Sequence, residues 1–427
     1  MRIVLKNVGK ISTADVEIKG ITVIGGENNS GKSTVGKTLF SLFNLYYNHE
    51  KRIMESKERN IRRLLNRVIQ DIDSLEDISI GKKQLFHKNV TPLLLNGVKD
   101  QSEIVSIINC AWSKISNDDD LLIDSNRLEN NTALRRDLER VYEVSIITKN
   151  QLFNQNLSAR LSAEFGMIPK NFYCTNEESS VDLIIKTDTI SASLETERVI
   201  VTGEIELHTE AIYIDDASIL DSILPPFGLN ISGVSHKDHL AQKFFMPSKS
   251  NDDVADVLAI NGIKRVIEKV DLVCPGKIDI SNSEVFYQSK PGVPPVQSIG
   301  LSEGLKLFII LKSLLLNRAI EENGTLILDE PEIHVHPEWQ LVLAELIVVL
   351  QKEFGLHFLI TTHSPYFLEA IEVFSQKYDI AEDCRYYLAE NVGDNAVIKD
   401  VTNDTEQIYQ KLVKPFQELE NMRKWND

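Results

Sequence analysis

The sequence predicts an α/β fold built on a parallel sheet, with a helical segment inserted into it. Two short alternating stretches lead into the apolar strand ITVIGG at 21–26, and a glycine-rich loop follows directly. The C-terminal part alternates strand-like and helical stretches, from TLILDE at 325–330 to CRYYLAE at 384–390. Alternation of this kind is typical of sheets with parallel strands. Residues 51–165 have a helical pattern instead.

The chain divides into three expected parts, because 427 residues exceed one ordinary domain. We expect an N-terminal lobe of the core at 1–48 and a helical insertion at 49–180. The remainder of the core is expected at 181–427, with a second helical piece at about 236–270. Strands resume after the insertion in SVDLIIKT, TISASLETERVIV and EAIYIDD.

Composition limits the compartment and the partners. A net charge of -17 opposes a generally basic surface for nucleic acid, so any nucleic-acid contact must be local. Four cysteines lie scattered without paired spacing, and the first residues, MRIVLKNVGKIS, form no apolar signal segment. The longest apolar runs are too short and interrupted to span a bilayer. We expect a cytoplasmic protein with no membrane partner.

The loop GENNSGKS at 26–33 matches G-x-x-x-x-G-K-[ST] at every fixed position. Its glycines let successive amides face a polyphosphate, and the following helix directs its N-terminus at the same anion. Lys32 is expected to reach the β and γ oxygens of ATP, and the Ser33 hydroxyl to ligate Mg²⁺. The alternative is a strand-to-helix turn that is merely rich in glycine. The full set expected around the phosphates is Gly26, Asn28, Asn29, Ser30, Gly31, Lys32, Ser33 and Thr34.

Two carboxylates end the apolar stretch TLILDE. In open α/β sheets, ligands bind at the C-terminal ends of the strands, which is where these carboxylates are expected. Asp329 is expected to hold Mg²⁺, directly or through water. Glu330 is expected to take a proton from the attacking water, because hydrolysis of a γ-phosphate needs an oriented nucleophile. A strand that ends in acids is common by itself, so this interpretation depends on the glycine-rich loop.

A histidine ends the next apolar stretch, FLITTH at 358–363. If the two strands are neighbours, His363 lies at the same sheet edge as Glu330. It can there hydrogen-bond the γ-phosphate or the lytic water and report which nucleotide is bound. In isolation, such a histidine is more often an ordinary surface residue.

The stretch SIGLSEGLK at 298–306 opens an apolar helix with two glycines around a serine. Ser302 and Gly304 thus mark a second anion-binding helix end, only 27 residues (329 minus 302) before Asp329. Because one chain already has a phosphate loop, this end is expected to serve the γ-phosphate of another copy. Reciprocal use of both features predicts a two-fold dimer around two ATP molecules, with a higher oligomer left open.

The ordered set GENNSGKST, LSEGLK, LILDEPEIHVHPEWQ and ITTHSP resembles the ABC-type ATPases of the RecF, structural-maintenance-of-chromosomes (SMC) and OLD group. It is most similar to the OLD-like bacterial ATPases, and the similarity covers 1–48 and 180–427 in outline. The resemblance implies a P-loop NTPase fold, an ABC-type ATPase head with an antiparallel β-subdomain. It also implies that Ser302 and Gly304 are signature residues acting in trans and that His363 is a switch histidine.

The resemblance further implies a role in bacterial anti-phage defence, with a separate nuclease or toxin as the effector. OLD nucleases carry a C-terminal TOPRIM domain, whereas only 64 residues (427 minus 363) follow His363 here. We therefore expect no nuclease activity in cis. Two alternatives stay open: a RecF-like DNA-repair ATPase that binds duplex DNA, and an ATP-locked scaffold that hydrolyses hardly at all and sequesters a toxin.

A local excess of positive charge marks the start of the insertion. Between Lys51 and Lys88 there are ten Lys and Arg against six Asp and Glu. Arg59, Arg63 and Arg67 recur at four-residue spacing opposite an apolar stripe. They are the best candidates for contact with nucleic acid or an acidic partner, and a solvated helix face is the alternative.

Two other polar clusters are assigned structural roles. Asp215 and Asp216, in YIDD, are expected to cap the following helix. His334 and His336 have a spacing found at some metal sites, but without a third ligand they predict a turn, with Pro337 starting the next helix.

Overall fold

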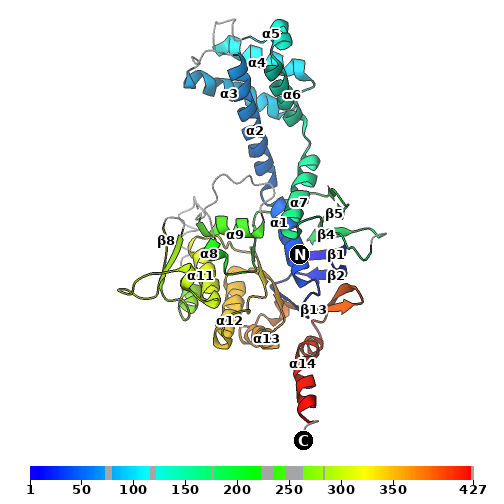
Figure 1. The fold of residues 1–427 in the computed structure, drawn as a ribbon, viewed down its shortest axis with the longest axis vertical. Helices are drawn as coiled ribbons and strands as arrows, with labels where there is room; N and C mark the ends of the chain where they lie inside the picture. Colours follow the sequence, from blue (N-terminus) through cyan, green and yellow to red (C-terminus); the bar gives the residue numbers. More distant parts are fainter. Residues whose placement is uncertain are drawn as a thin grey trace. The chain divides into compact units, whose positions relative to one another are not determined.

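The structure is a computed structural model of the chain. It describes residues 1–72, 79–115, 122–174, 177–222, 235–245, 263–281 and 284–424. The chain forms two compact units (Figure 1). The first unit comprises Met1–Tyr47 and Asn154–Asp427, and the second comprises Asn48–Phe153. Among the described helices, none combines the length and apolar character that a membrane span requires.

A mixed sheet of eleven described strands forms the centre of the first unit. Its neighbours β7, β11, β12, β3 and β13 run parallel, and β14 runs parallel to β2. The other pairs are antiparallel, including the run β2, β1, β4, β5 and β6. The predicted α/β fold, with a mixed sheet and an antiparallel part, is confirmed. In sheet order the strands are β6 (Val199–Thr202), β5 (Asp188–Leu194), β4 (Ser180–Ile185), β1 (Arg2–Val8), β2 (Ile11–Glu17), β14 (Asn395–Asp400), β13 (Cys384–Val392), β3 (Ile21–Gly26), β12 (His357–Thr362), β11 (Thr325–Asp329) and β7 (Ala211–Ile214).

Helices and a small second sheet complete this unit. The described residues include the helices α1 (Lys32–Tyr46), most of α7 (Lys149–Phe165), α8 (Ile219–Ser222), α9 (His236–Phe245), α11 (Glu303–Leu316), α12 (Pro337–Phe354), α13 (Pro365–Lys377) and α14 (Glu406–Lys424). The small antiparallel sheet consists of β8 (Lys277–Ser281), β9 (Glu284–Gln288) and β10 (Val296–Gln297). Of the helical piece predicted at 236–270, α9 and residues 263–270 are helical, and 246–262 lie outside the described residues.

The two faces of the sheet carry different side chains, because successive strand residues point to opposite sides. On one face, Ile212 and Leu328 join a large apolar core with α11 and α12. On the other face, Tyr213 and Ile327 pack against α1. A Cβ on Gly36 of α1 would lie 2.9 Å from Tyr213 Cε2 and 3.0 Å from Ile327 Cγ2. Glycine at this position therefore lets α1 approach the sheet closely.

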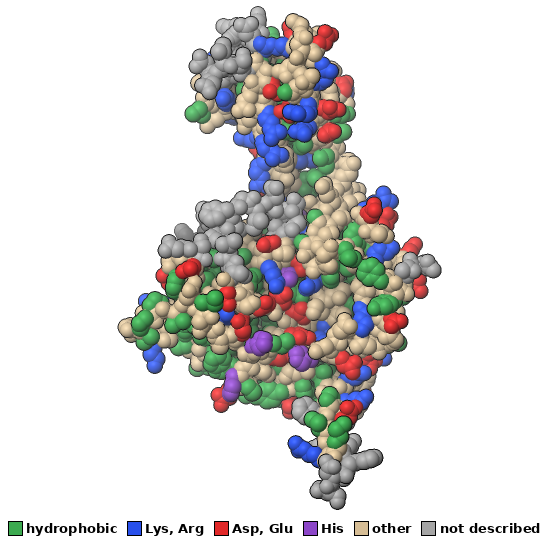
Figure 2. All heavy atoms as spheres, viewed as in Figure 1, with side chains coloured by type: hydrophobic (Ala, Val, Ile, Leu, Met, Phe, Trp, Pro, Cys, Tyr) green, Lys and Arg blue, Asp and Glu red, His purple; other side chains and the backbone are tan. Residues whose placement is uncertain are grey.

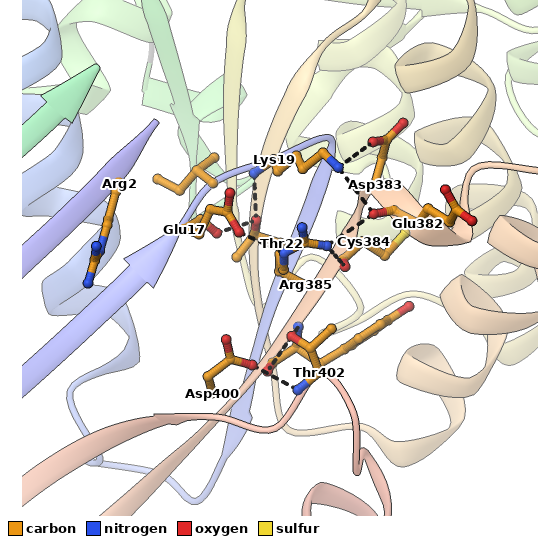
Figure 3. A network of polar contacts seen from close by, with 12 residues as sticks. Arg2, Glu17, Lys19, Thr22, Glu382, Asp383, Cys384, Arg385, Asp400 and Thr402 are labelled. Carbon is orange, nitrogen blue, oxygen red and sulfur yellow. Dashed lines mark hydrogen bonds and ion pairs between the residues drawn. The ribbon is translucent and has the colours of Figure 1, made fainter. Parts of the chain in front are cut away.

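Polar contacts fix the turn between β2 and β3 against β13 (Figure 3). The Lys19 Nζ lies 3.0 Å from Asp383 Oδ1, and Arg385 Nε donates to Glu17 Oε2 at 2.7 Å. A Cβ on Gly20 would lie 2.6 Å from the Asp383 carbonyl oxygen, and its φ of +50° also favours glycine. These contacts hold the beginning of β3, the strand that leads to the glycine-rich loop.

The second unit is helical. It contains α2 (His49–Ile72), α3 (Ile80–Leu95), α4 (Gln101–Ile115), α5 (Ser125–Asn130), α6 (Thr132–Ile146) and the start of α7. Its core includes Trp112 stacked on Phe86, with ring centroids 4.3 Å apart. The unit ends at Phe153. The insertion was expected at 49–180, so its C-terminal boundary lies earlier in the structure than in the prediction. The reason is that α7 continues along the sheet, where Asn154 and Ser158 accept hydrogen bonds from β6 backbone N–H groups.

Candidate nucleotide site

The glycine-rich loop lies between the buried strand β3 and α1, and its glycines are required by close contacts. Gly26 has φ +155°, and a Cβ there would lie 2.3 Å from the Ala389 carbonyl oxygen. Gly31 caps α1 with φ +83°, and a Cβ there would lie 2.6 Å from Ile11 Cγ1. Asn29 is also left-handed, at φ +57°. Since L side chains rarely adopt these angles, the backbone path itself selects this sequence.

Lys32 is a buried cation at the first position of α1, with only 4% of its surface exposed. Its Nζ donates to the carbonyl oxygens of Gly26 at 3.0 Å and Glu27 at 2.8 Å. The same nitrogen lies 3.4 Å from Glu330 Oε1. A buried ammonium needs several acceptors. Two carbonyls and one carboxylate supply them here, so a phosphate oxygen would have to replace one of these partners.

The other residues predicted around the phosphates lie along the same loop and helix start. Asn28 and Asn29 are exposed, while Ser30 is buried and donates to the Glu27 carbonyl at 2.7 Å. Ser33 and Thr34 lie half-buried in the first turn of α1. This helix end has no side-chain cap, so it offers backbone N–H groups to an anion.

Asp329 ends β11 and is buried, with 8% of its surface exposed. Tyr213 OH donates to its Oδ2 at 2.7 Å, and Thr361 Oγ1 donates to its Oδ1. These hydroxyls come from β7 and β12, the two strands beside β11. Burial and the neighbouring Asp329 raise the pKa of Tyr213 well above its usual value, so the phenol keeps its proton and acts as the donor.

Glu330 follows in a left-handed conformation, with φ +51°. Such a conformation costs a non-glycine residue of order 1–3 kcal/mol, and such residues cluster at functional sites. Its N–H is bonded to the Thr361 carbonyl at 3.1 Å and to Thr361 Oγ1 at 3.0 Å. This turn places its carboxylate beside Lys32 on one side and His363 on the other, with Oε2 3.4 Å from His363 Nδ1.

His363 follows β12, and a third acid supports it. Glu332 is 4% exposed and accepts hydrogen bonds from Thr362 Oγ1 at 2.5 Å and from the His363 N–H at 3.2 Å. Burial raises the pKa of Glu332. His363 itself is half-exposed, and its Nδ1 makes no hydrogen bond among the described residues. This nitrogen is buried and faces two carboxylates, 3.4 Å from Glu330 Oε2 and 3.9 Å from Glu332 Oε1.

Ser302 and Gly304 lie at the start of α11. Ser302 is exposed and caps the helix by accepting from the Leu305 N–H at 3.4 Å. Gly304 is buried, and a Cβ there would lie 3.0 Å from the His334 carbonyl oxygen. Within the described ranges Ser302 forms no hydrogen bond with the glycine-rich loop of its own chain. The structure thus brings Lys32, Glu330 and His363 together and leaves Ser302 exposed elsewhere.

The arginine row lies in the second unit, on the exposed face of α2. Figure 2 shows Lys and Arg side chains gathered on the visible face of this helical unit. Opposite them, the apolar stripe that contains Ile61 and Leu65 is buried in the unit's core. In the described part of the chain, Arg59, Arg63 and Arg67 form no ion pair, and Arg63 donates to Asn60 Oδ1 at 3.1 Å.

The residues present fit a magnesium nucleotide. In the described ranges no three His, Cys, Asp or Glu side chains converge on one metal position. Mg²⁺ in phosphate sites commonly needs only one or two protein oxygens, because phosphate oxygens and waters supply the rest. Ser33 and Asp329 offer a hydroxyl and a carboxylate, and Lys32 offers a buried positive charge. This donor set suits a metal-bound polyphosphate.

Sequence reasoning missed several polar partners of this site. Tyr213, Thr361 and Glu332 lie within apolar or acidic stretches without a motif of their own. Asp215, expected to cap a helix, instead contacts His236 Nε2 at 2.8 Å, while Asp216 does accept from the Ser218 N–H at 2.8 Å. Strand alternation places Tyr213 on one face of its own strand, but it does not indicate that the strand of Asp329 lies beside it.

The turn predicted after the acidic strand is present. His334 has φ +66°. His336 caps α12, which begins at Pro337 as expected.

One family model matches part of the chain. Residues 210–369 match a family model described as "AAA domain, putative AbiEii toxin, Type IV TA system". This match includes Ser302, Asp329 and His363, and the glycine-rich loop lies before it.

Three solved structures are among those similar to the chain. The SMC head domain from Thermotoga maritima is 12% identical, with a TM-score of 0.39, over 94% of this chain and 98% of that chain. An Smc head bound to the C-winged helix domain of ScpA is 10% identical, with a TM-score of 0.44, over 93% of this chain and 97% of that chain. An Smc head domain with an extended coiled coil, bound to the C-terminal domain of ScpA derived from Pyrococcus furiosus, is 10% identical, with a TM-score of 0.41, over 99% of this chain and 98% of that chain.

Proposed function

We propose that the chain binds ATP with Mg²⁺ at the loop 26–33 and hydrolyses it to ADP and phosphate. The observation that carries this proposal is the position of the Glu330 carboxylate, 3.4 Å from Lys32 Nζ and 3.4 Å from His363 Nδ1. A phosphate-binding cation, a base and a histidine from three separate elements meet there. Hydrolysis of a γ-phosphate depends on positioning of the water and stabilisation of charge on the phosphate, which these groups can supply together.

The residues have separable tasks in this reaction. Lys32 binds the β and γ oxygens, while Ser33 and Asp329 hold the metal ion, which neutralises charge on the phosphates when it is bound. Glu330 accepts the proton of the attacking water, and His363 hydrogen-bonds the γ-phosphate or that water. The left-handed turn at Glu330 keeps its carboxylate at the sheet edge.

We infer that two copies close around two ATP molecules. Ser302 is exposed at a helix N-terminus and is not bonded to its own phosphate loop, so it is free to face the γ-phosphate of a second copy. Gly304 keeps the start of α11 against His334. In such a dimer each chain contributes its loop 26–33 to one site and its helix end to the other.

The ATP-bound dimer is proposed to control a separate effector, a nuclease or a toxin, in bacterial anti-phage defence of the OLD-like kind. The description of the matched family names a putative toxin of a type IV toxin–antitoxin system, which supports a role in such a system without naming a separate effector. Affinity capture with Glu330→Gln and Mg·ATP is expected to retain the effector, and Lys32→Ala is the matched control. Equal capture by both variants would contradict ATP control.

A nucleic acid is the second candidate partner, because Arg59, Arg63 and Arg67 form an exposed row on α2 without ion-pair partners among the described residues. The logarithm of DNA affinity falls linearly with the logarithm of salt concentration. If this row binds phosphates, changing all three residues to Ala makes that line less steep, by about 0.9 for each phosphate that is no longer neutralised. Arg136 and Arg140 of α6, which lie near Asp137, provide the control. Unchanged binding by the triple variant would remove this surface as a nucleic-acid site.

Turnover of ATP by the purified chain, with and without duplex DNA, tests the proposed function. We expect Mg²⁺-dependent hydrolysis that Asp329→Asn abolishes. Stimulation by DNA favours a repair role of the RecF kind. Negligible hydrolysis together with tight, ATP-dependent partner binding favours a scaffold.

A further inference from the structure

The carboxylate of Asp329 is held from both sides by hydroxyl groups. Tyr213 OH donates to Oδ2 at 2.7 Å, and Thr361 Oγ1 donates to Oδ1. A carboxylate oxygen has two lone pairs, so each oxygen keeps one acceptor direction for a metal or its water. The hydroxyls therefore fix the orientation of this carboxylate without consuming its capacity to ligate.

Tyr213 is itself held without freedom to turn. It is fully buried, and its ring packs edge-on against Phe40 with centroids 6.2 Å apart. Gly36 lies against the same ring, where a Cβ would approach Cε2 to 2.9 Å. Both neighbours are on α1, the helix that begins at Lys32. The tyrosine thus links the first helix after the phosphate loop to Asp329.

A histidine held between two carboxylates, of which Glu164 is buried and Asp215 half-buried, lies against the tyrosine ring. The His236 ring centroid is 4.6 Å from that of Tyr213. Its Nδ1 is 2.5 Å from Glu164 Oε2, and its Nε2 is 2.8 Å from Asp215 Oδ2. The Glu164 Oε1 also accepts from the His236 N–H at 2.6 Å. Two carboxylates, one from α7 and one following β7, fix both the ring and the backbone of His236.

Neither His236 nor Glu164 contacts the phosphate loop or the pair Glu330 and His363 among the described residues. Glu164 and His236 are buried and Asp215 is half-buried, and burial of such charges is unfavourable unless they are paired, as they are here. An apolar cluster of the same volume would fill the space at least as well. The clamp, formed by Glu164, His236 and Asp215, instead fixes the plane of the His236 ring against the ring of Tyr213.

We propose that Tyr213 is a positioning residue for the metal-ligating carboxylate of Asp329, and that the clamp Glu164–His236–Asp215 holds Tyr213 in place. This inference rests on the proposed function, because it assigns Asp329 to the metal. Mg²⁺ accepts only near-ideal octahedral geometry, so a carboxylate that is free to rotate binds it less well. Partners that orient a metal ligand are typically worth about 10- to 100-fold in metal affinity.

The test measures metal binding directly rather than turnover. Mn²⁺, as a paramagnetic substitute for Mg²⁺, is titrated into the full chain with a non-hydrolysable ATP analogue, and free Mn²⁺ is read by electron paramagnetic resonance. Tyr213→Phe removes only the hydroxyl and is expected to weaken Mn²⁺ binding by about 10- to 100-fold. Binding of the analogue without metal, which depends on Lys32, should be unchanged.

Two further variants complete the test. Tyr287→Phe is the matched control: this buried tyrosine accepts from the Gly276 N–H at 3.2 Å in the small sheet, and its loss should leave Mn²⁺ affinity as in the wild type. His236→Gln keeps Tyr213 and its hydroxyl but loosens the ring, so Mn²⁺ affinity should fall by less than in Tyr213→Phe. It also serves as the test if Tyr213→Phe does not fold.

The outcomes separate this inference from the proposed function. If Asp329→Asn loses Mn²⁺ binding while Tyr213→Phe and His236→Gln both keep wild-type affinity, the positioning role is wrong and the metal assignment stands. If Asp329→Asn itself binds Mn²⁺ as the wild type does, the metal assignment is wrong and the inference is overturned with it.

Discussion

Glu330 lies between Lys32 and His363, with Oε1 3.4 Å from the ammonium and Oε2 3.4 Å from the imidazole Nδ1. The carboxylate thus contacts both the cation proposed to bind phosphate and the histidine proposed to hydrogen-bond the γ-phosphate or the attacking water. A nucleotide that enters must replace the contact between Lys32 and Glu330 with a contact between Lys32 and phosphate. Glu330 is then released toward the attacking water.

Replacing Lys32 should therefore abolish most nucleotide binding. A hydrogen bond to a charged group is worth about 1.5–3 kcal/mol, which corresponds to roughly 10- to 150-fold in affinity. We expect Lys32→Ala to lose at least this much affinity for a fluorescent ATP analogue in an equilibrium titration. Lys37→Ala, five residues later on α1, is the control and should bind normally. Normal binding by Lys32→Ala would contradict the assignment of the loop.

Glu330→Gln should leave ATP binding intact and remove most hydrolysis. Glutamine has the same shape but cannot accept a proton, and loss of a general base typically costs about 10²- to 10⁴-fold in rate. Steady-state phosphate release at saturating Mg·ATP is the measurement. Unchanged turnover would show that another group activates the water.

A mixture of two inactive variants should regain activity if the sites are shared. Ser302→Arg blocks the helix end and Lys32→Ala disables the loop, so a mixed dimer keeps one intact site. We expect hydrolysis to rise above that of either variant alone. Formation of mixed dimers is checked first with two affinity tags. If tagged mixed dimers form and remain inactive, the helix end does not act in trans.

The clamp around His236 predicts a pH dependence of stability. Burial alone would lower the pKa of His236, but hydrogen bonds from its ring to Asp215 and Glu164 outweigh burial and raise the pKa to about 9 from 6.5. Because His236 binds its proton more tightly in the folded state, it stabilises the fold. This contribution is complete below pH 6.5, the unfolded pKa, and is lost as pH rises through 9, the folded pKa. The free energy of unfolding should therefore fall by about 3 kcal/mol over this window because of His236.

Urea unfolding of wild type and His236→Gln at pH 6 and pH 9 checks this prediction. The variant should show a smaller loss of stability between the two pH values. His208→Gln, at an exposed histidine, should behave as the wild type. Equal pH dependence in wild type and His236→Gln would mean that the imidazole is not held as a cation.

The sequence predicted the parts of the site whose signals are local. The loop 26–33, the acids at 329–330 and His363 each follow an apolar strand, and parallel neighbours bring strand ends to one edge. The mixed sheet and its antiparallel part also agree with expectation.

The contacts between distant residues were not predictable in the same way. Tyr213 and Asp329 are separated by 116 residues, and Glu164 and His236 by 72. Such pairs depend on which strands become neighbours and on where α7 ends, neither of which follows from local periodicity. For the same reason Asp215 was assigned to a helix cap, although it pairs with His236.

The mass of Glu330→Gln in solution, measured by light scattering with saturating Mg·ATP, tests the central claim most directly. We predict a dimer of the 48.3 kDa chain with Mg·ATP and a monomer without nucleotide. A single copy at every protein concentration, with the nucleotide site shown to be filled, would contradict ATP held between two chains.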